Sequence, residues 1–132
     1  MENTVMIVED EDLIRALAVD AFTEAGFAVL EVSTGDEALE VLFSGEAVDV
    51  IVSDIRMPGA TDGLKLRREV EIRWPNIKMV LTSGHMEVER SELSENQLFV
   101  GKPYKFLELV REVEGLLSSH QSKNQSRGCR AS

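Results

Sequence analysis

The sequence has one cysteine and three prolines among its 132 residues, and it contains no long apolar run. No stretch of about 18 consecutive apolar residues occurs, so we expect no membrane-spanning helix. Residues 1–10 lack the basic start and apolar centre of a secretory signal, which favours a cytoplasmic location. Cys129 has no second cysteine with which to pair, and we interpret it as an exposed thiol without a function.

Two further absences argue against nucleotide and nucleic-acid binding. The chain contains neither G-x-G-x-x-G nor G-x-x-x-x-G-K-[ST], the glycine-rich loops that hold phosphates in nucleotide-binding domains. No acidic residue follows Ser118, whereas three basic residues do: Lys123, Arg127 and Arg130. The formal charge is −10 for the whole chain and therefore −13 for residues 1–118. A surface this negative repels nucleic acid, so we predict no direct DNA or RNA binding.

The composition is that of one globular domain. With 43% hydrophobic and 29% charged residues, the chain has room for a single folded unit. Residues 119–132 are poor in apolar side chains, and we expect them to form a disordered polar tail. The predicted division is a folded domain over residues 1–118 followed by this tail.

Apolar runs of strand length alternate with segments of helical period along the folded part. Most of the runs are apolar throughout, which is typical of strands buried on both faces of a parallel sheet. The predicted strands are 5–8, 27–32, 48–52, 79–81 and 98–100. The predicted helices are 12–25, 36–43, 62–73, 86–95 and 104–117, of which 86–95 has the weakest pattern. This alternation predicts an α/β fold, a doubly wound five-stranded parallel sheet with helices on both faces.

Chemically reactive side chains stand where four of these strands end. Glu9 and Asp10 follow the first strand, Asp54 follows the third, Thr82 the fourth and Lys102 the fifth. Ligands of open parallel sheets bind beyond the carboxyl ends of the strands, so these side chains are expected to share one site. Three carboxylates in one pocket repel each other unless a cation offsets them, and Mg²⁺ is the hard, oxygen-preferring ion suited to that task.

Each of these residues also has a purely structural interpretation. Glu9, Asp10 and Asp12 would suit the N-terminus of the following helix, where negative charge is favourable. Asp54 is able to start a turn, and Thr82 to be a strand-end residue with a satisfied hydroxyl. The structural interpretation of Lys102 is that of an ordinary surface cation. As a set, however, a hydroxyl, an ammonium and a divalent cation are the groups that stabilise a phosphoryl group in transfer.

Four short motifs, in chain order, resemble the active-site signature of the receiver domain of bacterial two-component response regulators. They are Val8-Glu9-Asp10, Val52-Ser53-Asp54, Leu81-Thr82-Ser83 and Gly101-Lys102-Pro103, and the resemblance extends over residues 3–117. It implies the strand order 2-1-3-4-5 and makes Asp54 the phosphoacceptor, with Thr82 and Lys102 as the other catalytic residues. It also implies that Glu9, Asp10, Asp54 and the backbone carbonyl of Arg56 hold Mg²⁺, and that the Lys102–Pro103 bond is cis.

The same resemblance implies a conformational switch and a set of partners. The switch residues would be Thr82, Phe99 and Pro103, with Thr82 moving toward the phosphoryl group and Phe99 turning inward, although Phe99 is equally well explained as a core residue. The phosphodonor would be a sensor histidine kinase or a histidine phosphotransfer protein, docking near Leu13 and Ala16, which fall outside the apolar stripe of helix 12–25. The output would be contact with a downstream protein, and the chain would be a monomer or a weak phosphorylation-dependent dimer.

Two departures from the family pattern and two rival classes complete the prediction. The loop 57–63 is slightly longer than the commonest receiver form, and Glu9 stands where many receivers have Asp. A haloacid-dehalogenase-type phosphatase would need a second acid two residues after Asp54, where this chain has Arg56. A non-phosphorylated pseudo-receiver acting as an interaction module remains the alternative. We expect a phosphoacceptor regulator with at most self-phosphotransfer and autodephosphorylation activity, and no other enzymatic function.

Overall fold

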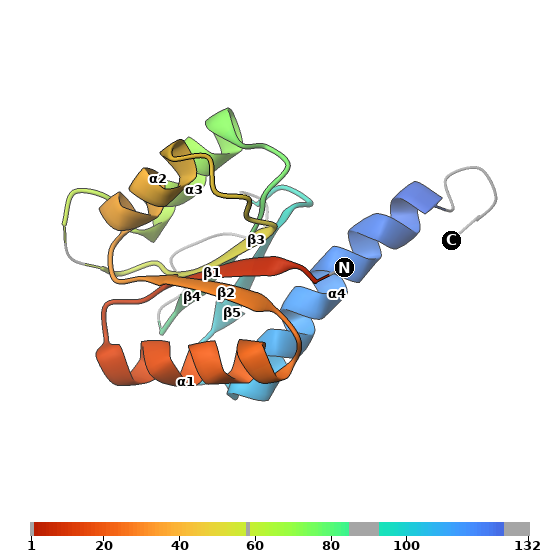
Figure 1. The fold of residues 1–132 in the computed structure, drawn as a ribbon, viewed down its shortest axis with the longest axis horizontal. Coiled ribbons are helices and arrows are strands. Elements are labelled where there is room, and N and C mark those ends of the chain that lie inside the picture. Colours follow the sequence, from red (N-terminus) through yellow and green to blue (C-terminus); the bar gives the residue numbers. More distant parts are fainter. Residues whose placement is uncertain (1, 58, 85–92, 126–132) are drawn as a thin grey trace.

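A computed structural model describes residues 2–57, 59–84 and 93–125 of the chain, and the side chains of residues up to 118. Five parallel strands form one sheet in the order β2-β1-β3-β4-β5, which confirms the predicted topology (Figure 1). The strands are β1 Thr4–Val8, β2 Ala28–Val32, β3 Val50–Asp54, β4 Lys78–Ser83 and β5 Gln97–Gly101.

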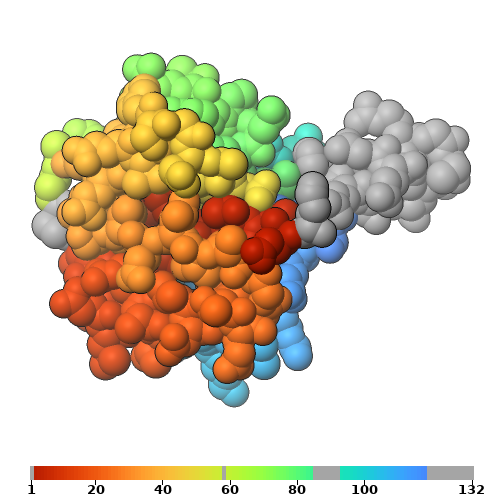
Figure 2. Space-filling view, viewed as in Figure 1, coloured from red at the N-terminus to blue at the C-terminus, as the bar shows by residue number. Residues whose placement is uncertain are grey.

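Four helices of the described part cover the two faces of the sheet. They are α1 Asp12–Glu24, α2 Gly35–Phe43, α3 Gly63–Arg73 and α4 Phe106–Gln125. Helices α1 and α4 contact each other on one face, and α2 and α3 lie together on the other (Figure 1). Figure 2 shows the same layers as a packed surface, with the N-terminal part of the chain, in dark red, reaching the surface between them. The fifth helix expected over 86–95 falls mostly outside the described residues.

Local sequence explains where these helices begin. Thr34 precedes α2 and its hydroxyl accepts a hydrogen bond from the backbone N–H of Glu37. Asp62 does the same for α3 through the N–H of Lys65. Both side chains satisfy backbone donors that the first helical turn leaves without an intrahelical partner.

The last helix differs from the prediction at both ends. It begins at Phe106 rather than at residue 104, and it continues to Gln125 instead of ending at residue 117. The first part of the segment expected to be a disordered tail is therefore helical. Residues 118–125 contain neither glycine nor proline, so the helical backbone continues although the apolar pattern has stopped. Among the residues that the structure describes, no helix is both long and apolar enough to cross a bilayer.

The central strands are buried on both faces, which is why their sequences are apolar throughout. Val5 and Ile7 of β1 pack toward α1 and α4, whereas Met6 and Val8 pack toward α2 and α3. All four are at most 2% exposed. Because successive side chains of a strand point to opposite faces, one strand contributes to both cores. The sheet therefore holds the carboxyl ends of β1, β3, β4 and β5 in a fixed register beside one another.

Candidate functional site

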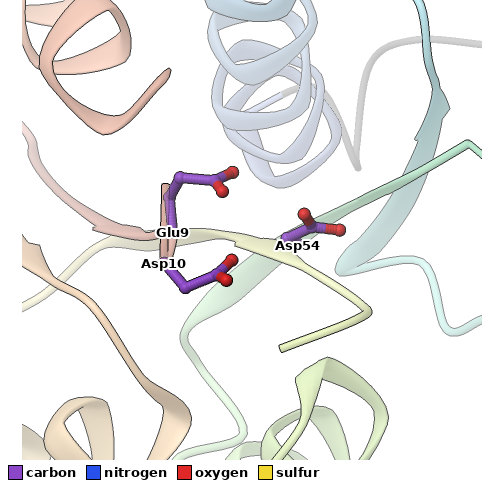
Figure 3. A group of neighbouring side chains, drawn as sticks. All are labelled: Glu9, Asp10 and Asp54. Atoms are coloured by element: carbon purple, nitrogen blue, oxygen red, sulfur yellow. The ribbon is translucent and has the colours of Figure 1, made fainter. Parts of the chain in front are cut away.

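The acidic residues predicted from the strand ends do meet in space. Glu9 and Asp10 follow β1, and Asp54 ends β3, so the three carboxylates face a common space at the edge of the sheet (Figure 3). One oxygen from each lies within 4.8 Å of the others. Glu9 and Asp54 are only 5% and 7% exposed, whereas Asp10 is exposed to solvent. Two buried acids beside a third form a strongly negative pocket with an open side.

Lys102 supplies the positive charge of this pocket. Its Nζ donates a hydrogen bond to Oδ2 of Asp54 at 2.9 Å, across 48 residues of sequence. The residue follows β5, where its backbone N–H donates to the carbonyl of Ser83 at 2.8 Å. The peptide bond from Lys102 to Pro103 is cis, as the family resemblance implied. The ammonium is thus held against the carboxylate that was predicted to accept the phosphoryl group.

Thr82 lies beside Asp54 because β3 and β4 are paired. The two residues are register partners, and the Thr82 carbonyl accepts a hydrogen bond from the N–H of Ile55 at 2.9 Å. Thr82 is 2% exposed, and it lines a small cavity of about 10 Å³ together with Glu9, Asp54 and Tyr104. The pairing places the Thr82 side chain next to the acids in the lining of this cavity.

The two remaining residues, Arg56 and Phe99, lie next to this pocket. Arg56 is exposed, and its backbone N–H makes a long hydrogen bond of 3.4 Å to Oδ1 of Asp54. Phe99 is partly buried and packs against the core on the α2 and α3 face. The structure therefore brings Glu9, Asp10, Asp54, Thr82 and Lys102 together, whereas Phe99 lies in the adjoining core.

Burial shapes the electrostatics of the pocket. Burial raises the pKa of the Glu9 carboxyl to about 7, with Asp54 adding to the effect and the backbone N–H of Glu11 opposing it. For Lys102, burial alone lowers the pKa of the ammonium. The hydrogen bond and the charges of Asp54 and Glu9 outweigh burial, so the pKa of Lys102 lies above its ordinary value. The Lys102 ammonium therefore stays charged at neutral pH. The Glu9 carboxyl, with its raised pKa, is protonated more readily than an ordinary carboxyl.

Two residues of the site were not predicted from the sequence. Tyr104 lines the small cavity, and burial raises the pKa of its phenol, which lies close to the Thr82 hydroxyl and to the charges of Lys102 and Glu9. Its position directly after the Lys-Pro pair was the only available signal. Arg15 donates to the backbone carbonyl of Glu9 at 2.9 Å. Nothing in the spacing of charges identifies that contact, since its acceptor is a backbone atom.

The donor set fits a hard divalent cation. Three carboxylates within one pocket offer only oxygen ligands, and Asp10 keeps the pocket open to water. Mg²⁺ prefers such oxygen donors and retains several waters, so it suits a partly open carboxylate site. A soft metal would require cysteine or histidine, and neither is present in the cluster.

Comparison with known protein families shows which family the chain belongs to. A family model described as "Response regulator receiver domain" matches residues 5–114. The chain belongs to the response regulator receiver family, whose members act as phosphoacceptors in two-component signalling.

Two curated relatives show how such domains occur in larger proteins. The chain is 37% identical over 118 residues to the sensor kinase CckA of Brucella abortus, covering 86% of this chain and 12% of the kinase. It is 32% identical over 126 residues to the DNA-binding transcriptional regulator NtrC of Escherichia coli K12, covering 93% of this chain and 26% of the regulator. The chain thus matches only a minor part of each of these relatives.

Two solved receiver structures superpose on this chain over nearly their whole length. A response regulator receiver protein from Sinorhizobium medicae superposes with a TM-score of 0.81 at 32% identity, covering 89% of this chain and 96% of that one. The response regulator protein TrrA of Thermotoga maritima, solved in complex with Mg²⁺-BeF, gives a TM-score of 0.74 at 32% identity, covering 86% of this chain and 98% of that one.

Proposed function

We propose that Asp54 is the residue that accepts the phosphoryl group, taking it from a phosphohistidine. A carboxylate oxygen of Asp54 attacks phosphorus, the bond from phosphorus to the imidazole nitrogen breaks, and that nitrogen leaves with the electron pair. The product is an acyl phosphate on Asp54. The observation that carries this proposal is the contact of 2.9 Å between the buried Asp54 carboxylate and the Lys102 ammonium. In this contact a charged donor lies beside the carboxylate that would take up the phosphoryl group.

Lys102 and Thr82 have complementary roles in this reaction. Negative charge spreads over the equatorial oxygens of a phosphoryl group in transfer, and fixed donors at those oxygens lower the barrier. The Lys102 ammonium exchanges its contact with Asp54 for one with an incoming oxygen. The hydroxyl of Thr82, the register partner of Asp54, donates to a second. Phosphotransfer to itself from small donors and autodephosphorylation would use the same groups.

The metal would be held by the acidic cluster. We assign Glu9, Asp10, Asp54 and the backbone carbonyl of Arg56 as the residues that bind Mg²⁺. When bound, the cation offsets the repulsion among the carboxylates and the charge of the phosphoryl oxygens. The complex of TrrA with Mg²⁺-BeF supports the choice of Mg²⁺ as the cation.

The proposed docking surface for the phosphodonor is an apolar groove of about 550 Å³ between α1 and the segment after β5. Leu17, Pro103 and Phe106 line it, and so does Lys102, which contacts Asp54. Leu13, on the same helix, is 71% exposed. A helix of a sensor kinase or phosphotransfer protein seated there would bring its phosphohistidine to the open side of the acidic pocket. Exposed apolar side chains next to a reactive site are typical of such interfaces.

The decisive experiment is incubation with acetyl phosphate and Mg²⁺, followed by intact-mass measurement. The wild type is expected to gain one labile phosphoryl group, and chelation of Mg²⁺ should abolish the gain. Asp54→Asn should gain none, whereas the control Asp20→Asn, on the exposed side of α1, should behave as the wild type. An unmodified wild type would refute the proposal and favour the pseudo-receiver alternative, which no feature of the described pocket supports.

A further inference from the structure

Arg15 connects three separate segments at the edge of the acidic pocket. Its Nη1 donates to the backbone carbonyl of Glu9 at 2.9 Å, its Nη2 to Asp12 at 2.7 Å and its Nε to Glu31 at 3.2 Å. These acceptors belong to the end of β1, the start of α1 and the strand β2. The guanidinium group is planar and rigid, so three bonds made at once fix its orientation. The side chain is only 18% exposed.

The Glu9 carbonyl is the important acceptor, because it belongs to the peptide that joins Glu9 to Asp10. Holding this oxygen fixes the plane of that peptide and with it the direction in which the Asp10 side chain leaves the backbone. The remaining restraints act on Glu9 itself. Its N–H donates to the Val32 carbonyl at 3.1 Å, and its carboxylate accepts from the N–H of Glu11 at 3.1 Å. Of the bonds described in this turn, only the one from Arg15 acts on the peptide leading into Asp10.

The ion pairs of Arg15 do not account for its burial or its placement. Asp12 and Glu31 are 91% and 53% exposed, and exposed ion pairs contribute little to stability. A long side chain that served only these partners would be free to remain in solvent. The bond to the Glu9 carbonyl, in contrast, requires the guanidinium to lie against the turn.

We propose that Arg15 is a positioning residue for the Glu9 and Asp10 pair and thereby sets the affinity of the acidic cluster for a divalent cation. The proposal rests on the Mg²⁺ site of the proposed function. It predicts that removal of Arg15 changes Mg²⁺ affinity in the direction opposite to the change expected from its charge alone. A cation near the cluster repels Mg²⁺, so an Arg15 that acted only through its charge would weaken metal binding, and its removal would tighten it. A positioning role requires that its removal weakens binding.

The test measures Mg²⁺ binding by isothermal titration calorimetry without any phosphodonor. Arg15→Met is expected to weaken Mg²⁺ binding by about tenfold, the loss typical when a group that orients metal ligands is removed. Arg15→Lys keeps the charge but cannot bridge three acceptors, and it should also weaken binding. The control Glu31→Gln removes one exposed partner of Arg15 but leaves the bond to the Glu9 carbonyl intact, and it should change the dissociation constant by less than about twofold.

Further measurements separate positioning from general damage to the fold. Circular dichroism and thermal unfolding show whether each variant folds, and if Arg15→Met does not, Arg15→Lys decides the outcome. At saturating Mg²⁺, the rate of phosphorylation by acetyl phosphate should return to that of the wild type. Unchanged or tighter Mg²⁺ binding in folded Arg15 variants would overturn the proposal. A wild type that binds no Mg²⁺ would instead refute the metal site of the proposed function.

Discussion

Glu9 is a buried acid whose carboxyl has a pKa of about 7, set mainly by burial. In the unfolded chain the same group has a pKa near 4.5. Because the folded state disfavours the ionised form, the native protein binds a proton at Glu9 more tightly than the unfolded chain. The resulting loss of stability is absent below pH 4.5, develops between pH 4.5 and 7, and is complete above that range.

This linkage predicts that Glu9→Gln stabilises the metal-free protein relative to the wild type, and that the stabilisation increases as the pH rises. At pH 8 in EDTA, the free energy of unfolding should exceed that of the wild type by about 2–3 kcal/mol, and at pH 5.5 the gain should be clearly smaller. Urea unfolding at the two pH values measures it. Added Mg²⁺ should reduce the gain, since it stabilises the wild type through the ionised carboxylate. A gain independent of pH would contradict this account.

At the scale of secondary-structure elements, the loop after Asp54 is held at two points near its C-terminal end. At its base, the N–H of Gly63 donates to the Ile55 carbonyl at 2.9 Å. Two residues earlier, the Thr61 hydroxyl donates to Asp36 of α2 at 2.5 Å. The longer loop of this chain is thus attached to the neighbouring helix and closed against the end of β3.

At Gly63 the loop lies so close to the end of β3 that no side chain has room there. A Cβ atom at this position would lie 2.5 Å from the Asp54 carbonyl oxygen and 2.6 Å from the Ile55 Cα, both backbone atoms that cannot turn aside. Gly63→Ala should therefore destabilise the protein by about 1–3 kcal/mol and slow phosphorylation of Asp54. As a matched control, Gly115→Ala in α4 meets nothing within 4 Å and should stabilise by about 0.5–1 kcal/mol. Thermal unfolding of both variants checks the contrast, and equal effects would count against it.

At the scale of the whole molecule, α1 carries two exposed apolar side chains, one of which lines the groove that reaches Lys102. Leu13 and Leu17 are 71% and 44% exposed, and Leu17 lines this groove together with Lys102. Helical spacing places Leu17 with Ile14 and Ala18 on the apolar stripe of α1, yet its side chain lies at the exposed edge of that stripe. Ile72, on α3, is 75% exposed on the other face of the sheet. We therefore expect the phosphodonor protein to dock on the α1 side, where the groove adjoins Lys102.

Docking on this face can be separated from chemistry by changing the donor. Leu13→Glu and Leu17→Glu should slow transfer from the cognate phosphorylated kinase or phosphotransfer protein by roughly tenfold or more, as loss of an interface anchor does. Phosphorylation by acetyl phosphate, which needs no docking, should be unchanged. The control Ile72→Glu should leave both rates unaltered. Equal transfer from the protein donor to all three variants would exclude this surface.

Strand pattern and motif order were enough to predict the sheet, its topology and the meeting of Asp54 with Glu9, Asp10, Thr82 and Lys102. This is because buried parallel strands are apolar throughout, and their carboxyl ends meet at one edge. The contacts of Arg15 and Tyr104 were decided only by the tertiary structure. One acceptor of Arg15 is a backbone carbonyl, and Tyr104 enters the pocket after the turn at Pro103. Likewise, helical spacing puts Leu17 on an apolar stripe, but only the packing of neighbouring elements determines which edge of that stripe stays exposed.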